Sequence, residues 1–225
     1  MKFVAVIPAR KGSKTIKNKN LTIIKKKPLI EYTFNEVKKS KLKKESYVLT
    51  DSKKIKKIAK KYHVNNDYIR PKFLSSNKTS LLATIKHFVK WILKKRKIDY
   101  VVILQPTSPL RNFRDINNAI LHLKKKKLKS LFSISESLEH PYETISINKK
   151  TWSYVVPKAK LYYRRQDFDL NSYFINGAIY IVNVNLILKN KMHDKFKHGF
   201  YKMPKIRSFD INDKEEIEIT KKILR

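Results

Sequence analysis

Cysteine is absent from this 225-residue chain, so disulfides, thiolate metal sites and a cysteine nucleophile are all excluded. Any metal site must therefore use oxygen or imidazole ligands. No apolar run approaches the roughly 18 residues of a membrane helix, and the run at the N-terminus is too short for a secretory signal. These absences favour a cytoplasmic protein that has no membrane among its partners.

Glycine is scarce, with only 3 in the chain, and neither a Walker loop nor a Gly-x-Gly-x-x-Gly fingerprint occurs. This weakens the ATPase and dinucleotide-binding interpretations. Apolar residues make up 41% of the chain and aromatic residues 11%, which argues against a disordered polymer. We therefore expect one globular domain over residues 1–225, with a single core.

Acidic residues are few, because 18 Asp and Glu face 53 Lys and Arg, which gives a net charge of +35. Such a charge would attract a nucleic acid, and it would equally attract a triphosphate. The lysines are scattered beside predicted helix faces and are not gathered in one basic tail. We therefore favour lysine-rich solvated surfaces, with no specific nucleic acid as partner, and keep a nucleic-acid-binding protein as the alternative.

Apolar runs and amphipathic segments alternate along most of the chain. Strands that are apolar throughout indicate an α/β fold with a mostly parallel, Rossmann-like sheet covered by helices on both faces. The alternation breaks between His140 and Phe174, which predicts an inserted substructure. The expected strands are 3–7, 47–49, 100–104, 131–134 and 178–182, and the expected helices begin near Pro28, Asp51 or Ser52, Ser80, Asp115 and Asp213.

Ligands of open parallel sheets bind outside the carboxyl ends of strands, so the loops after Ile7, Leu49, Leu104 and Val182 are the candidates. The loop after Ile7 is the richest in charge, and it also contains Gly12 and Ser13. Cations and free backbone N–H groups suit a polyphosphate, although a solvated lysine-rich loop has the same composition. Its cations are Arg10, Lys11, Lys14, Lys17 and Lys19.

Short motifs recur in a fixed order along the whole chain. The N-terminal loop reads Ile7-Pro-Ala-Arg-Lys-Gly-Ser-Lys, followed by Lys19-Asn20-Leu21 and Lys27-Pro28-Leu29-Ile30. The later motifs are Thr50-Asp51, Arg70-Pro71, Thr79-Ser80, Leu104-Gln-Pro-Thr-Ser-Pro-Leu-Arg111, Arg165-Gln166-Asp167, Asn176-Gly-Ala-Ile-Tyr180 and Asp210-Ile211-Asn212. This series resembles the acylneuraminate cytidylyltransferases, or CMP-sialic acid synthetases, which have a fold of the nucleotide-diphospho-sugar transferase type.

The resemblance implies that CMP passes from CTP to the anomeric hydroxyl of a nine-carbon sugar acid, such as sialic, legionaminic or pseudaminic acid, with release of pyrophosphate. It implies catalytic roles for Arg10, Lys19 and Asp210, and Mg²⁺ bound by Asp210 and Asn212. It also implies two further sets of contacts. Nucleotide contacts would come from Ala9, Arg10, Gly12, Ser13, Lys19, Asn20, Arg70 and Ser80, and sugar contacts from Gln105, Arg111, Arg165, Asn176 and Tyr180.

Two departures from the family pattern concern the metal site and the phosphate loop. Asn212 stands where the family usually has a second aspartate, and asparagine supplies a carbonyl ligand without charge. Asp213 could compensate, but with Glu216 it also fits a helix capping box, which we favour. Lys11 and Thr15 replace glycines of the commoner loop.

The resemblance further implies a homodimer, in which the insertion from His140 to Phe174 reaches the partner and helps to form the sugar pocket. Two alternatives to a nine-carbon substrate stay open. The sugar could be the eight-carbon 3-deoxy-octulosonate, or the chain could be an impaired relative that binds nucleotide only, as the uncharged Asn212 suggests.

Overall fold

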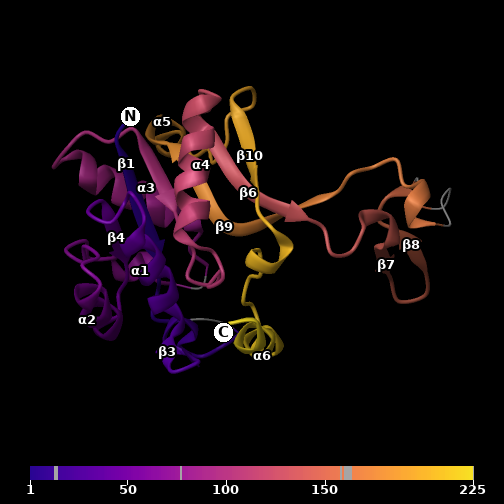
Figure 1. The fold of residues 1–225 in the computed structure, drawn as a ribbon, viewed down its shortest axis with the longest axis horizontal. Helices are drawn as coiled ribbons and strands as arrows, with labels where there is room; N and C mark the ends of the chain where they lie inside the picture. Colours follow the sequence, from indigo (N-terminus) through magenta and orange to yellow (C-terminus); the bar gives the residue numbers. More distant parts are fainter. Residues whose placement is uncertain (13–14, 77, 158, 160–163, 225) are drawn as a thin grey trace.

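The computed structural model of the protein describes residues 1–12, 15–76, 78–157, 159 and 164–224 (Figure 1). Among these residues the central sheet has six strands, in the order β10-β6-β9-β5-β1-β4. Five of them run in one direction, and β9 alone is antiparallel to its neighbours. The strands are β1 (Phe3–Pro8), β4 (Ser46–Leu49), β5 (Tyr100–Ile103), β6 (Ser130–Glu136), β9 (Tyr173–Asn183) and β10 (His198–Lys202).

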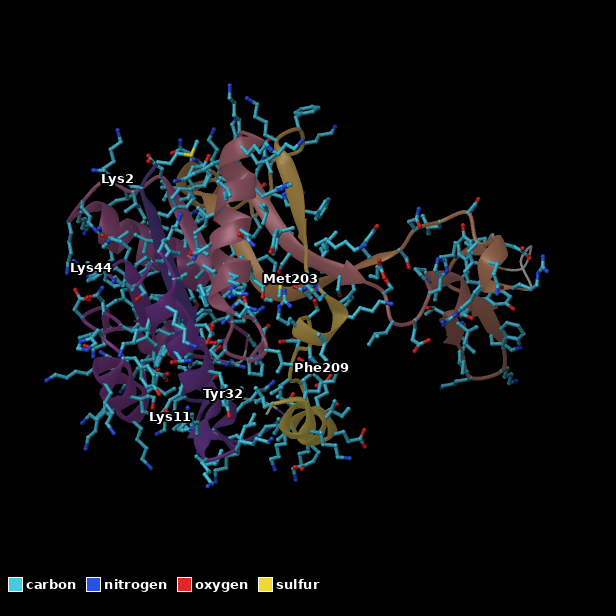
Figure 2. All side chains as sticks on the ribbon, in the orientation of Figure 1. Lys2, Lys11, Tyr32, Lys44, Met203 and Phe209 are labelled. Atoms are coloured by element: carbon cyan, nitrogen blue, oxygen red, sulfur yellow. The ribbon has the colours of Figure 1, made fainter. Side chains whose placement is uncertain are left out.

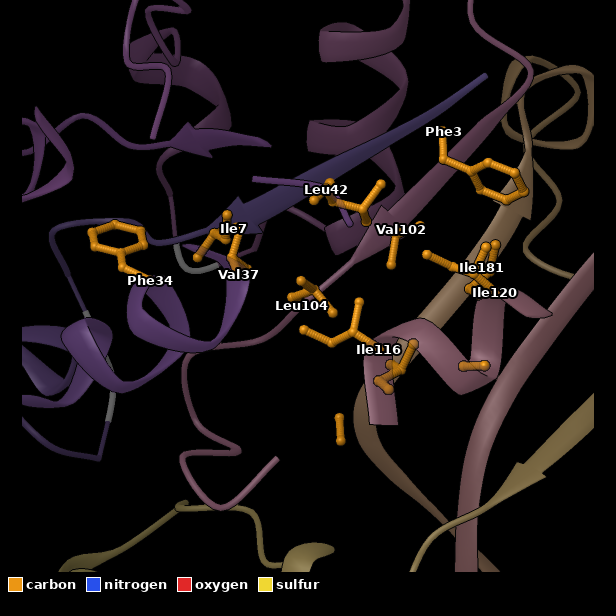
Figure 3. Close-up of a cluster of buried hydrophobic side chains, with 14 of the residues drawn as sticks. Phe3, Ile7, Phe34, Val37, Leu42, Val102, Leu104, Ile116, Ile120 and Ile181 are labelled. Atoms are coloured by element: carbon orange, nitrogen blue, oxygen red, sulfur yellow. The ribbon is translucent and has the colours of Figure 1, made fainter. Parts of the chain in front are cut away.

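Successive residues of β1 enter two separate cores, one on each face of the sheet. Ala5 and Ile7 pack in one core with residues of α1, α2 and α4, and Figure 3 shows part of it. Val4 and Val6 pack in the other with residues of α3 and α5. The prediction of helices on both faces is confirmed. The helices are α1 (Leu29–Lys39), α2 (Lys53–Lys61), α3 (Leu81–Leu93), α4 (Phe113–Lys125), α5 (Val184–Leu188) and α6 (Lys214–Ile223).

Side-chain caps fix where several of these helices begin. Ser52 accepts a hydrogen bond from the N–H of Ile55 at the start of α2, and Ser80 accepts one from Ala83 at the start of α3. The expected capping box of Asp213 and Glu216 is present at α6. The expected start at Asp115 is two residues late, because Asn112 caps α4 and Asp115 is the third residue of its first turn.

The direction of β9 corrects one expectation about the site. Ile103 of β5 pairs with Tyr180, and Val101 pairs with Val182, so β9 descends as β5 rises. The loop after Val182 therefore lies beside the amino ends of β1 and β5, and the site lies at their carboxyl ends. The expectation that this loop borders the ligand site is wrong. The residues of β9 just before Tyr180 lie beside the carboxyl end of β5 instead.

The described residues between His140 and Phe174 form an arm that projects from the core on the paired ends of β6 and β9 (Figure 1). Pairing of Ser135 with Phe174 and of Glu136 with Tyr173 forms the base of the arm. No helix among the described residues is long and apolar enough to span a membrane. The arm contains the hairpin of β7 (Ile145–Ile147) and β8 (Trp152–Tyr154), and a second small hairpin, β2 (Ile23–Ile24) with β3 (Lys27–Pro28), precedes α1.

Lysine side chains are spread over the surface of the sheet and its helices, as the sequence predicts. Lys2, Lys11 and Lys44 lie at three separate places on it (Figure 2). On α2 the buried residues are Ile55 and Ala59, while lysines occupy most of the remaining positions. The positive charge of this helix is therefore the solvated face of an amphipathic element.

Candidate functional site

A cavity of about 300 Å³ opens at the carboxyl ends of β1 and β5, beside the N-terminus of α3. This is the place where a parallel sheet is expected to hold its ligand. Of the residues that the sequence predicts for the site, three cations, three amide or hydroxyl side chains and one glycine line this cavity. These predicted residues are Arg10, Gly12, Lys19, Asn20, Arg70, Ser80 and Gln105, all of which line the same cavity.

The loop after β1 is held in place by contacts with its own backbone and with neighbouring loops. The side-chain amide of Asn20 donates to the carbonyl of Arg10 at 3.1 Å. The Arg10 guanidinium donates to the carbonyl of Ser76 at 2.8 Å, and the N–H of Lys11 donates to Asp51 at 2.7 Å. The Thr50-Asp51 motif thus anchors the loop that carries Arg10.

Arg70 supplies a second cation, from the segment that precedes α3. Its Nε and Nη2 both donate to the carbonyl of Leu74, at 3.1 and 2.5 Å, which leaves the Nη1 side of the fork for another acceptor. Arg70 is buried, and that burial lowers its pKa, while the nearby Asp51 acts in the opposite direction. A bound anion would offset the cost of burying this charge.

Lys19 links the cavity to the acidic segment before α6. Its ammonium donates to the carbonyls of Ile211 and Asn212, at 2.9 and 3.4 Å. Burial lowers the pKa of Lys19, and the carboxylates of Asp210, Glu216 and Asp213 oppose that shift. An ammonium has three N–H donors, so one remains for a phosphate oxygen.

The acidic segment borders a second cavity, of about 350 Å³, lined by Asp210, Asn212 and Glu216 among others. Oδ1 of Asp210 is buried without a hydrogen-bond partner among the described residues. An orphaned carboxylate oxygen fits an oxygen-preferring cation such as Mg²⁺. Asp213 is engaged elsewhere, because its carboxylate accepts the N–H of Glu216 at 2.9 Å in the capping box.

Arg111 and Asn176, two residues predicted to contact the sugar, lie beneath the site and are only 1% exposed. Arg111 donates to two backbone carbonyls and to Thr33. Asn176 accepts from Ser133 at 2.6 Å and donates to Ser208 at 2.9 Å, which ties β6 and β9 to the segment before Asp210. The predicted contact of Arg111 with the sugar does not fit this geometry, because both of its terminal nitrogens donate to the protein.

Three other predicted residues are not among the described residues that line the cavity, namely Ala9, Tyr180 and Arg165. Ala9 is fully buried in the core, and Ser13 lies outside the described residues. Tyr180 is half-buried against Phe132, with ring centroids 4.9 Å apart, and burial raises its pKa, with a smaller contribution from Asp210. Arg165 lies on the arm, where it pairs with Glu143 at 2.6 Å.

The cavity also contains polar residues to which the sequence analysis assigned no role. Thr79, Thr84 and Thr107 line it together with the predicted set. Thr84 lies one helical turn after Ser80, on the same face of α3, so the helical spacing could have identified it. Thr107 follows Gln105 within the motif already singled out.

The fold and the cation-lined cavity are those of an α/β protein that can bind a phosphate-bearing ligand at the ends of parallel strands. A solved structure of CMP:2-keto-3-deoxy-manno-octonic acid synthetase complexed with CTP matches this fold with a TM-score of 0.72. The match covers 100% of this chain and 98% of that one, at 15% sequence identity. Similarity at this level of identity establishes the fold.

The chain belongs to the cytidylyltransferase family, whose sequence profile matches residues 4–222. It is 32% identical over 200 residues to the CMP-N,N'-diacetyllegionaminic acid synthase of Legionella pneumophila, which covers 85% of this chain and 82% of that protein. It is 29% identical over 218 residues to an N-acylneuraminate cytidylyltransferase of Streptococcus agalactiae. That alignment covers 96% of this chain but 52% of the relative, so the chain spans about half the length of the streptococcal protein.

Gly177 is the residue at the site whose backbone most restricts substitution. It has a φ of +70°, and an added Cβ would lie 3.1 Å from Nε2 of Gln105. We predict that Gly177→Ala lowers the free energy of unfolding by about 1–3 kcal/mol, measured by urea denaturation. Gly12→Ala is the matched control, because an added Cβ there meets nothing within 4 Å. Equal stability of the two variants would contradict this account of Gly177.

Proposed function

We propose that the protein transfers CMP from CTP to the anomeric hydroxyl of a nine-carbon sugar acid of the sialic, legionaminic or pseudaminic type. The observation that supports this most strongly is the convergence of Arg10, Lys19 and Arg70 on one cavity at the strand ends. We assign CTP as the nucleotide because the chain belongs to the cytidylyltransferase family, and we assign the class of acceptor from the names of its relatives. The neutral Asn20 and Ser80 in the same wall suit the cytidine end of CTP.

The proposed reaction is an in-line displacement at the α-phosphorus of CTP. The anomeric hydroxyl loses its proton to solvent, and its oxygen forms a new bond to the α-phosphorus. The bond from that phosphorus to the oxygen of the β-phosphate breaks, and pyrophosphate leaves with the electron pair. Arg10 and Lys19 bind the phosphates and stabilise the negative charge that grows on the leaving group. No covalent intermediate with the protein is needed, so positioning and charge stabilisation account for catalysis.

Mg²⁺ is part of this proposal, and Asp210 with Asn212 would hold it. The ion would supply charge neutralisation on the phosphates and promote ionisation of the attacking hydroxyl. The orphaned Oδ1 of Asp210 fits such a ligand. The backbone carbonyl of Asn212 accepts hydrogen bonds from Lys19 and Thr15, so the acidic segment and the phosphate loop are held together.

A homodimer is also proposed, with the arm as the contact. The arm exposes large apolar side chains, including Ile147 at 75%, Trp152 at 61% and Phe174 at 61%. Because the arm projects away from its own core, Arg165 would serve the sugar pocket of a second copy (Figure 1). Light scattering at micromolar concentration should give twice the monomer mass, and a monomer would refute the arrangement.

Arg10→Ala tests the phosphate-binding role. We expect kcat/KM to fall by about 100- to 1000-fold, because a cation that stabilises the leaving group is lost. Pyrophosphate release with saturating sugar acid measures the effect. Lys11→Ala is the control, because its backbone N–H and not its side chain contacts Asp51, and it should change turnover little. Near-normal turnover of Arg10→Ala would remove Arg10 from the site.

Asp210→Asn tests the metal site. We expect the Mg²⁺ concentration for half-maximal rate to rise by about tenfold or more, and direct Mn²⁺ binding followed by electron paramagnetic resonance to weaken in parallel. Asp213→Asn is the control, since asparagine is an equally good N-cap and keeps α6 intact. If metal binding by Asp210→Asn matches that of the control, Asp210 is not a ligand.

A further inference from the structure

Arg111 is among the largest fully buried side chains of the described protein, and it has an unusual set of partners. One terminal nitrogen, Nη1, donates to the carbonyl of Gln105 at 3.0 Å and to the carbonyl of Ala178 at 2.8 Å. The other, Nη2, donates to the hydroxyl of Thr33 at 2.7 Å. Burial lowers the pKa of Arg111 to about 10, which reflects the cost of keeping a charge there.

The carbonyl of Ala178 belongs to β9, and that of Gln105 lies two residues beyond the end of β5. The backbone pairing of β5 with β9 ends at Ile103 with Tyr180, and continuing that register would place Gln105 opposite Ala178. The guanidinium bridges the chains at this level, beyond the end of the strand pairing. Arg111 thus connects the two chain segments by side-chain hydrogen bonds at the point where the backbone pairing of β5 with β9 has ended.

Gln105 is the residue of this group that faces the cavity. Its Nε2 donates to the carbonyl of Gly177 at 3.2 Å. Gly177 directly precedes Ala178, whose carbonyl accepts from Arg111. Gln105 is therefore fixed twice, through its own carbonyl and through its side-chain amide. That amide has two N–H donors and one carbonyl, so one N–H and the oxygen remain for a substrate group.

We propose that Arg111 is a positioning residue that sets the orientation of the Gln105 amide toward hydroxyl or amide groups of the sugar acid. This proposal rests on the proposed function. A planar guanidinium can reach two carbonyls and a hydroxyl in fixed directions, whereas the single ammonium of lysine cannot reproduce that fork. Arg111 acts through Gln105 and does not touch the substrate.

Arg111→Lys in a double-mutant cycle with Gln105→Ala tests the proposal. Arg111→Lys alone should raise KM for the sugar acid by about tenfold and leave KM for CTP within about twofold, because one contact group is misplaced. In the Gln105→Ala background the same change should alter KM for the sugar by less than about twofold. A full tenfold effect in that background would overturn the proposal.

The side-chain amide signal of Gln105 in a ¹⁵N–¹H spectrum, assigned by its loss in Gln105→Ala, gives a readout independent of turnover. It should shift in Arg111→Lys and also in Thr33→Val, which removes one partner of Arg111 and serves if the lysine variant does not fold. Thr220→Val is the control, because Thr220 is buried on α6 without a hydrogen-bond partner among the described residues. It should leave the signal unchanged.

The two claims fail in distinguishable ways. If the wild-type protein turns over no sugar acid, the proposed function fails, while the Gln105 signal still reports whether Arg111 orients that amide. If the wild-type protein is active and the signal does not move in Arg111→Lys or in Thr33→Val, the positioning role is refuted. Arg111 would then contribute to stability alone.

Discussion

The antiparallel course of β9 is the constraint on which the rest of the site depends. Because β9 runs against both β5 and β6, its first residues pair with the end of β6 and form the base of the arm. Its middle residues then pass the end of β5, where Gly177 meets Gln105. One strand therefore connects the arm to the cavity wall, and the left-handed backbone of Gly177 allows the close approach between them.

Buried positive charge is the second theme of the structure. Arg70 and Lys19 border the cavity, and burial lowers the pKa of each. Each uses only part of its donor set on backbone carbonyls, so both retain hydrogen-bonding capacity toward a ligand. A polyanion would compensate for the burial of these charges, which is why the arrangement suits a triphosphate. Arg111 differs, because its terminal nitrogens are committed to the protein.

The local features of the fold could be predicted from sequence, because they depend on short-range periodicity and capping. The starts of α2 and α6 and the apolar strands are examples. The direction of β9 could not be predicted, since an apolar run has the same pattern in either orientation. The burial of Arg111 could not be predicted either, because a motif does not show whether a side chain lies at the surface or beneath it.

Pyrophosphate release by the purified protein, with CTP and Mg²⁺, tests the central claim most directly. Sialic, legionaminic, pseudaminic and octulosonic acids would be offered separately, with UTP and ATP as nucleotide controls. The account predicts release with CTP and at least one nine-carbon acid, and little with UTP or ATP. The absence of pyrophosphate release with every sugar acid, despite measurable CTP binding, would contradict the proposed reaction. Release with octulosonic acid alone would contradict the proposed nine-carbon acceptor.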